Sequence, residues 1–258
     1  MEKLPLKLET VIFMALVHLG ALLGFKYFTW NAFYLCLILC FCTGCLGITI
    51  CYHRLLTHGS FTCNPIIKYL FTIFGVLAWQ MGPVSWVMLH RKHHQYSDTD
   101  KDPHSPIKSF LWAHLLWMFY IRPDEFYKYV PDLEKDTGLV IIEDLHYIIN
   151  IAFIVLLWLV GGMPFLVWGF FIRTVIVWHG TWTINSLCHV VGYRNFKTKD
   201  TSKNVWWLWP ITYGENFHNN HHFNPTSAKH GLRWFEIDIS YAIIKFLERL
   251  GLASNIKT

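Results

Sequence analysis

The chain has few charged residues. Of its 258 residues only 15% are Asp, Glu, Lys or Arg, whereas 53% are hydrophobic and the mean hydropathy is +0.31. An ordinary soluble domain carries about 25% charged residues. No run of Lys and Arg forms a stripe that could bind nucleic acid, so we expect no nucleic-acid partner. The net charge of +5, with His neutral, instead suits anionic lipid headgroups or an acidic protein partner.

The sequence also lacks a disulfide framework, a signal peptide and a segment that would bind haem or flavin. Five of the seven cysteines fall within residues 36–51, an apolar stretch in which they act as small fillers. The Cys-Phe-Cys and Cys-Thr-Gly-Cys spacings there could bind a metal, but nothing polar nearby favours loss of the thiol protons. The start has mixed charge, and the apolar run after it has no cleavage-like end.

Long apolar stretches predict an all-α membrane protein. A helix that spans a bilayer needs about 20 mainly apolar residues. We expect four such helices, in two hairpins, at about residues 10–28, 32–52, 145–160 and 163–183. Pro65 to Trp79 is too short to span and predicts a helix in the membrane interface. Arg173, inside the last span, is costly there unless it faces protein or reaches the interface.

The distribution of charge predicts the topology of this single domain, residues 1–258. The hairpin turns near residues 30 and 161 carry almost no charge, whereas the segments rich in Lys and Arg fall on the opposite side. The positive-inside rule therefore places both termini and the segments 53–144 and 190–258 in the cytoplasm or stroma. We expect these two segments to form a helical cap on the membrane helices.

Histidine is concentrated in this cap. Three clusters read His53-Arg-Leu-Leu-Thr-His58, His90-Arg-Lys-His93-His94 and His218-Asn-Asn-His221-His222, and His189 precedes the third. Imidazole binds iron, zinc, copper and nickel, and these nine side chains are too many for one tetrahedral ion but suit two metals. The spacing of the second and third clusters places their histidines on one face of a helix. His53 and His58 would diverge by about 140° on an α-helix, so a helix end or loop between them is expected.

Further polar residues are candidates for supporting roles. Asn185 lies one turn before His189 and could position a metal-bound water. Metal-bound imidazoles usually donate their second N–H to a carboxylate or carbonyl. The carboxylates near the clusters in sequence are either such partners or part of a solvated acidic face: Asp98, Asp100, Asp102, Glu215 and Asp238. The remaining histidines belong to no cluster and are not expected to be ligands. His179, ten residues before His189, is the one for which a supporting role is in doubt.

The three histidine motifs, in this order between two hairpins, resemble those of the membrane fatty-acid desaturases of Δ9 type. The resemblance runs from about residue 35 to residue 250 and includes Leu46-Gly-Ile-Thr49, Ser97-Asp-Thr-Asp-Lys-Asp-Pro-His104, Thr181-Trp182 with Asn185-Ser186 and His189, and Tyr213-Gly-Glu215. It implies that the nine histidines bind two irons. With O2 and two electrons, such a centre removes two hydrogens from neighbouring CH2 groups of a long acyl chain and leaves a cis double bond.

The resemblance also implies a bent tunnel for the acyl chain. Gln80, Trp86, Thr181 and Trp182 match residues that line the bend, and Phe41 and Cys45 match positions near the closed end. Packing between helices would use the same residue types. The animal acyl-CoA enzymes carry Arg-Asp immediately before the second motif, where this chain has Met88-Leu89. Because Arg suits an anionic headgroup better than Leu does, we favour a glycerolipid-bound chain over acyl-CoA.

An electron donor must be a separate protein. Ferredoxin or cytochrome b5, both acidic, could dock on basic residues such as Arg91, Lys92, Arg194, Lys197 and Lys199. Two other functions stay open at this point: a di-iron membrane hydroxylase or ketolase, and a metal-binding membrane transporter. Transport would favour ligands inside the spans, whereas here they lie at helix ends and in the cap.

Overall fold

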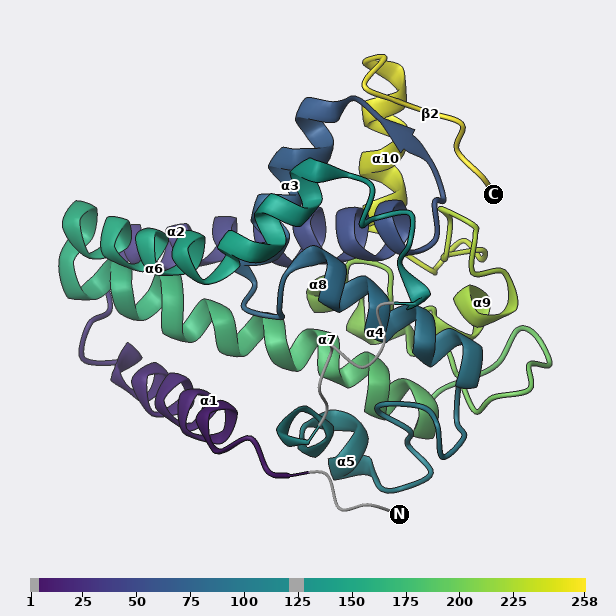
Figure 1. Ribbon diagram of the computed structural model, residues 1–258, viewed down its shortest axis with the longest axis horizontal. Coiled ribbons are helices and arrows are strands. Elements are labelled where there is room, and N and C mark those ends of the chain that lie inside the picture. The colour runs from purple at the N-terminus through teal and green to yellow at the C-terminus, as the bar shows by residue number, and fades with distance from the viewer. Residues whose placement is uncertain (1–4, 121–127) are drawn as a thin grey trace.

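The computed structural model describes residues 5–120 and 128–258, which are mostly helical. Figure 1 shows long helices gathered at one end of the molecule and short helices and loops at the other. Within the described residues, the paired strands are β1 (Thr62–Cys63) and β2 (Ala253–Ser254), which are antiparallel, and isolated bridges join Asn204 to Tyr193 and Phe217. The predicted helical class is therefore confirmed.

Two continuous helical segments are long and apolar enough to cross a membrane. The first, Trp30–Thr57, joins α2 (Trp30–Cys40) to the π-helical η2 (Phe41–Thr57). The second, Thr137–Val190, joins α6 (Thr137–Leu166), η5 (Val167–Ile172) and α7 (Arg173–Val190). It turns back at Gly162, whose φ of 59° and ψ of −150° are not helical, at the turn that the sequence predicts (Figure 1).

The helices are longer than the apolar runs that predict them. The helix expected to end near residue 52 continues to Thr57, the one expected to begin near 145 begins at Thr137, and α7 extends past 183 to Val190. Asp136 starts α6 by accepting a hydrogen bond from Leu139 N at 3.2 Å, as an N-cap does. Hydropathy reports the apolar part of a helix, whereas hydrogen bonding and capping set its ends. His53 and His189 consequently lie on helices.

The N-terminal arm is shorter than a span. Helices α1 (Leu8–Ala21) and η1 (Leu22–Gly24) form an apolar pair below the length of the two long segments. Gly24 lets this arm approach η5 closely, because a Cβ there would lie 2.6 Å from a methyl group of Ile172. Its carbonyl accepts a hydrogen bond from Trp168 Nε1 at 3.2 Å. Helices α1 and η1 thus pack against η5, and α2 packs against the same segment.

Helix α3 (Pro65–Leu77) is short, as predicted, and it crosses η2 at two glycines. A Cβ on Gly47 would lie 2.4 Å from the backbone N of Gly75, so only glycine permits this approach. One face of α3 is buried against η2 and α6, whereas Ile66 on the other face is 75% exposed. The helix is thus enclosed on one side and open on the other.

The C-terminal end of α3 is capped by side chains from the second hairpin. Asn150 of α6 donates to the Val76 carbonyl at 3.0 Å, and Trp178 Nε1 donates to the carbonyls of Ala78 and Trp79. Arg173 donates to the carbonyls of Leu77 and, at 3.0 Å, Gly169. Its side chain is fully buried, so it faces protein, the arrangement in which a cation is tolerated in this helix.

The cap consists of short helices in loops. After α4 (Pro83–Tyr96) come α5 (Phe110–His114) and η3 (Leu116–Phe119), and after α7 come η6 (Trp206–Leu208), α8 (Trp209–Thr212), α9 (His218–Phe223) and α10 (Ile239–Arg249). The last helix buries Ser240, Ile244 and Leu247. Beyond it, β2 pairs with β1, and Lys257 N donates to Ser60 O at 2.9 Å. The C-terminal segment is therefore hydrogen-bonded to the loop that follows His58.

Candidate metal centre

The nine predicted histidines come together in two groups. The first group contains His53, His58, His90, His94 and His221, and the second contains His93, His189, His218 and His222. Within each group the candidate ligand atoms lie within 4.8 Å of one another. Helices α4 and α9 each supply histidines to both groups, so the two clusters share their walls. Two neighbouring sites, one with five imidazoles and one with four, fit two metals as the sequence predicts.

A π turn brings His53 and His58 onto one side. His58 ends η2, and its backbone N–H donates to the carbonyl of His53 at 3.2 Å, an i→i+5 hydrogen bond. Such a turn places residues five apart one above the other, where an α-helix would splay them. The two imidazole rings are 4.8 Å apart. The helix end that the spacing requires is therefore the last turn of the π-helical η2.

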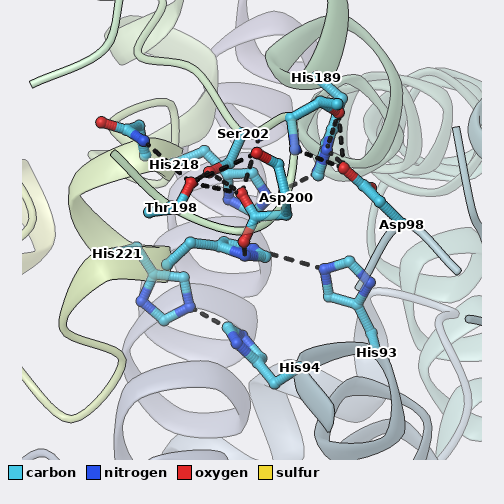
Figure 2. A network of polar contacts seen from close by, with 12 residues as sticks. His93, His94, Asp98, His189, Thr198, Asp200, Ser202, His218 and His221 are labelled. Carbon is cyan, nitrogen blue, oxygen red and sulfur yellow. Dashed lines mark hydrogen bonds and ion pairs between the residues drawn. The ribbon is translucent and has the colours of Figure 1, made fainter. Parts of the chain in front are cut away.

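Within each group, Nε2 atoms of different histidines lie close to one another. In the first group, His53 Nε2 lies 3.1 Å from His221 Nε2, which lies 2.9 Å from His94 Nε2. In the second, the Nε2 atoms of His189 and His218 are 3.1 Å apart (Figure 2). A neutral imidazole has one acceptor nitrogen, and several such nitrogens directed at one point suit a shared cation. The donor set thus fits a first-row transition metal in each group.

Carboxylates hold the opposite nitrogen of four of these histidines. Glu215 lies 2.7 Å from His53 Nδ1, Asp102 lies 3.0 Å from His93 Nδ1, and Asp98 lies 3.2 Å from His189 Nδ1. Asp200, which sequence reasoning missed, accepts a hydrogen bond from His222 Nδ1 at 2.9 Å. The negative charge of each carboxylate favours the proton on Nδ1, and Asp102 and Asp200 also accept a hydrogen bond from it, so that Nε2 is left free as a ligand.

The other two expected carboxylates do not contact a cluster histidine through their side chains. Asp100 is exposed. Asp238 bonds to Arg54 Nη1 at 3.1 Å and to the backbone N of His230 at 2.7 Å, so it supports the loop behind the first group. No spacing pattern marks Asp200, since it lies among lysines 22 residues before His222.

Two histidines that lack a motif also join the network. His230 lies 3.2 Å from Glu215 and its ring is 4.6 Å from that of His221, while His104 lies 3.7 Å from Asp102. Sequence reasoning left both out because neither has a neighbouring histidine in the chain. His179 bonds to His18 at 3.1 Å and to His114 at 3.0 Å, outside both groups.

The electrostatic setting favours the neutral form of six of the nine histidines and the charged form of Glu215. Burial, with repulsion from neighbouring imidazoles, holds the pKa of His58, His90, His94, His218 and His221 well below the usual range. Burial lowers the pKa of His222 to about 4. Burial alone would raise the pKa of Glu215, but His53, His230 and Arg54 outweigh it and lower that pKa. Neutral imidazole is the form that binds a metal.

An apolar cavity of about 630 Å³ leads to the clusters. Four of the six predicted tunnel residues, Gln80, Trp86, Thr181 and Trp182, line it together with His53, His90, His218 and Asn185. Gln80 bridges Thr181 Oγ1 at 2.9 Å and Trp86 Nε1 at 3.3 Å. Phe41 and Cys45 do not line this cavity. The lining uses their neighbours Gly44 and Ile48 on η2, while Cys45 lies 3.6 Å from Ser240 Oγ.

Clustered imidazoles beside an apolar cavity define a helical protein whose histidine groups are compatible with a metal site and whose cavity has room for a long apolar ligand. Residues 28–245 match the family model for fatty acid desaturase, and the chain belongs to this family. It is 42% identical to an sn-2 palmitoyl-lipid 9-desaturase of Nostoc sp., over 95% of this chain and 88% of that one.

Two further relatives differ in the acyl carrier that their names give. An sn-1 stearoyl-lipid 9-desaturase of Synechocystis sp. is 41% identical over 96% of this chain and 79% of that one. An icosanoyl-CoA 5-desaturase of Limnanthes douglasii is 39% identical over 98% of this chain and 73% of that one. The chain is therefore a fatty acyl desaturase, and the carrier has to be argued from its own residues.

Proposed function

We propose that the two groups hold two iron ions and that the chain introduces a cis double bond at Δ9 into a long acyl chain carried by a glycerolipid. The observation that carries this proposal is the convergence of nine imidazoles in two groups beside an apolar cavity, which His53, His90 and His218 line. Bound iron supplies the activation of O2 that removal of unactivated hydrogens requires. Names of relatives support the Δ9 position and the lipid carrier.

The protein's own residues bind and orient in this scheme. Carboxylates at Nδ1 fix four ligand rings, and Asn185, which lines the cavity beside the four-histidine group, would hold a water as a fifth donor there. The bridge from Gln80 to Thr181 and Trp86 shapes the cavity wall near the first group. Tyr213, Gly44 and Ile48 also line the cavity and would limit chain length.

The carrier is proposed from the residues before the second motif. Met88 is fully buried and Leu89 is 3% exposed, so these positions offer neither charge nor access to an anionic headgroup. A CoA headgroup carries phosphates that call for Arg or Lys. A glycerolipid needs no such site, because its headgroup stays at the membrane surface while the acyl chain enters the cavity. These features favour the lipid carrier over acyl-CoA.

We further propose that four helices cross the membrane, in two hairpins, with both termini and all clusters on the cytoplasmic or stromal side. The two long apolar segments and the turn at Gly162 support the second hairpin and half of the first. Few charges at the turns and many at the opposite end support the orientation. The arrangement places the metal groups next to water while the cavity stays open to lipid.

Fatty-acid profiling in a host that lacks its own Δ9 desaturase tests the function. We expect a new Δ9 monounsaturated acid in the glycerolipids, two mass units below its saturated parent. His93→Ala should abolish it, whereas the matched variant His18→Gln, outside both groups, should retain it. A gain of sixteen mass units would instead identify a hydroxylase. Unchanged lipids with altered metal uptake would identify a transporter.

The carrier is tested separately with the purified protein and a reducing system. Saturated glycerolipid in vesicles and saturated acyl-CoA are supplied in parallel, and the products are analysed by gas chromatography. We expect the double bond to appear in the glycerolipid first. Desaturation confined to acyl-CoA would contradict the carrier and leave the desaturase reaction in place.

A further inference from the structure

Residues 194–203, here named the basic loop, connect α7 to η6 and carry four cations. They are Arg194, Lys197, Lys199 and Lys203, and the first three are exposed. Figure 1 shows the chain after α7 protruding at the end of the molecule opposite the turn at Gly162. The basic loop therefore lies at the end of the molecule away from the apolar turn of the second hairpin, and a soluble protein can reach the loop there.

The one carboxylate of the basic loop does not cancel this charge at the surface. Asp200 lies among the clustered histidines (Figure 2) and accepts a hydrogen bond from His222 Nδ1 at 2.9 Å. Its other oxygen accepts from Thr198 Oγ1 at 2.8 Å and from Ser202 N at 3.0 Å. The negative charge of Asp200 is thus directed into the protein, whereas Lys197 and Lys199 are exposed to solvent.

The basic loop also reaches two ligands of the four-histidine group. Besides His222, held by Asp200, it contacts the partner of His189: Thr201 donates its N–H and hydroxyl to Asp98 at 2.5 and 2.6 Å, and Asp98 lies 3.2 Å from His189 Nδ1. The consecutive residues Lys199, Asp200 and Thr201 therefore lead from solvent to the metal group. A carrier docked here would be separated from the metal ligands by one layer of side chains.

Hydrogen bonds to the third histidine motif hold the basic loop in place. Asn219 Oδ1 accepts from the backbone N of Asn195 at 2.9 Å and of Phe196 at 2.8 Å. Arg194 ties the loop to itself through the Asp200 carbonyl at 2.9 Å. Phe196 stacks on Phe223, which is 54% exposed, so an apolar patch lies beside the lysines. A fixed cationic rim around an apolar contact is typical of a protein-binding surface.

Within the described residues, a second surface near a cluster, the one around His58, has paired charges. Around His58, Arg91 binds Asp132 through Nη2 at 2.8 Å, and Lys68 binds Asp136 at 2.5 Å. These pairs leave little net field to attract an acidic partner, although Arg91 is among the basic residues that the sequence suggested for docking. Charge complementarity therefore favours the basic loop.

We propose that the basic loop is the docking surface for a small, acidic one-electron carrier protein, an inference that rests on the proposed desaturase function. For each double bond, one O2 is reduced to two waters by four electrons and four protons. The acyl chain supplies two electrons and two protons. The carrier supplies the other two electrons, one at each of two binding events, and the other two protons come from water. Such carriers bind transiently through small, charged interfaces that are sensitive to salt.

Binding of oxidised carrier to the full chain in lipid nanodiscs tests the surface without turnover. The probes are a plant-type [2Fe–2S] ferredoxin and the soluble domain of cytochrome b5. We expect Lys197→Glu with Lys199→Glu to weaken Kd at low salt by about tenfold or more. The matched variant, Lys135→Glu with Lys257→Glu, makes the same charge change at exposed lysines outside the loop and should bind as the wild type does. Iron content and the unfolding midpoint report that both variants fold.

The outcomes separate the surface from the function. Equal Kd values for the two double variants, or wild-type binding that does not weaken with salt, would overturn the docking surface even if unsaturated lipid forms. Loop-dependent binding without any new double bond would leave the surface standing and overturn the proposed function. Loss of binding in both double variants would contradict the assignment to this loop and indicate a diffuse effect of net charge.

Discussion

Four carboxylates decide which nitrogen of a ligand histidine faces its cluster. Glu215, Asp102, Asp98 and Asp200 each lie within 3.2 Å of an Nδ1 atom. Without an acceptor at Nδ1, the imidazole could rotate or take the other tautomer, and Nε2 would no longer be available. At the scale of single residues, the orientation of these candidate ligands therefore depends on carboxylates that do not belong to the two histidine groups.

Asp200→Asn should weaken metal binding at the four-histidine group. The amide can turn its N–H toward His222, which removes the acceptor that fixes Nδ1–H, and loss of such a partner costs about 10–100-fold in metal affinity. Iron per chain, measured after dialysis against a weak chelator, should fall toward one. Asp100→Asn is the matched control, because Asp100 is exposed, and it should keep both metals. Full iron retention in Asp200→Asn would contradict this role.

The lowered histidine pKa values predict the acid sensitivity of the metal-free protein. His222, with a pKa of about 4, stays neutral when folded and takes up a proton near pH 6.5 when unfolded. The unfolded chain then binds more protons, so the free energy of unfolding falls as the pH falls from about 6.5 to about 4. His58, His90 and His94 act in the same direction, whereas His93, whose pKa Asp102 raises against the effect of burial, opposes it.

This sign is checked by thermal unfolding of the metal-free protein in detergent at pH 7 and pH 5. We expect a lower midpoint at pH 5. The lowered pKa of Glu215 adds to the loss below about pH 4.5, because its contribution is present above the pKa of the unfolded state and disappears as it becomes protonated. A midpoint that stays constant or rises at pH 5 would show that the buried imidazoles are already protonated in the folded state.

At the scale of elements, the sequence predicts what local spacing determines. The HxxHH spacings on α4 and α9 and the glycine turn at residues 161–162 follow from local periodicity and turn chemistry, and the structure has them. For the π turn between His53 and His58, the sequence predicts only that a regular α-helix must end or be interrupted there. The caps of α3 and the bond from Asp200 to His222 join residues distant in sequence, so no local pattern reports them.

Removal of the Arg173 cap should destabilise the fold. Arg173→Met leaves the Leu77 carbonyl without its donor at the buried end of α3, and an unsatisfied buried group costs about 1–3 kcal/mol. We expect a lower unfolding midpoint in detergent. Arg249→Met, at an exposed arginine near the end of α10, is the control and should unfold as the wild type does. An unchanged midpoint in Arg173→Met would mean that this cap contributes no net stability.

At the scale of the whole molecule, the two ends differ in chemistry. The hairpin end carries exposed apolar side chains, such as Leu159 at 68% and Val160 at 67%. The other end carries the metal groups and the basic loop (Figure 1). The paired strands and the bond from Lys257 to Ser60 close this end by joining the C-terminal segment to the loop after the first histidine motif. This polarity predicts that a membrane separates the hairpin turns from the basic loop.

Cysteine labelling in sealed vesicles tests that polarity. In a background with Cys42→Ser and Cys63→Ser, which removes the partly exposed native thiols, Asn31→Cys marks the first turn and Lys199→Cys marks the basic loop. A membrane-impermeant maleimide should label Lys199→Cys only from the cytoplasmic or stromal side and Asn31→Cys only from the opposite side, because a charged reagent cannot cross the apolar core. Detergent should expose both positions equally and provides the control. Labelling of both from one side would contradict a membrane-crossing first hairpin and leave the chain lying on a single face.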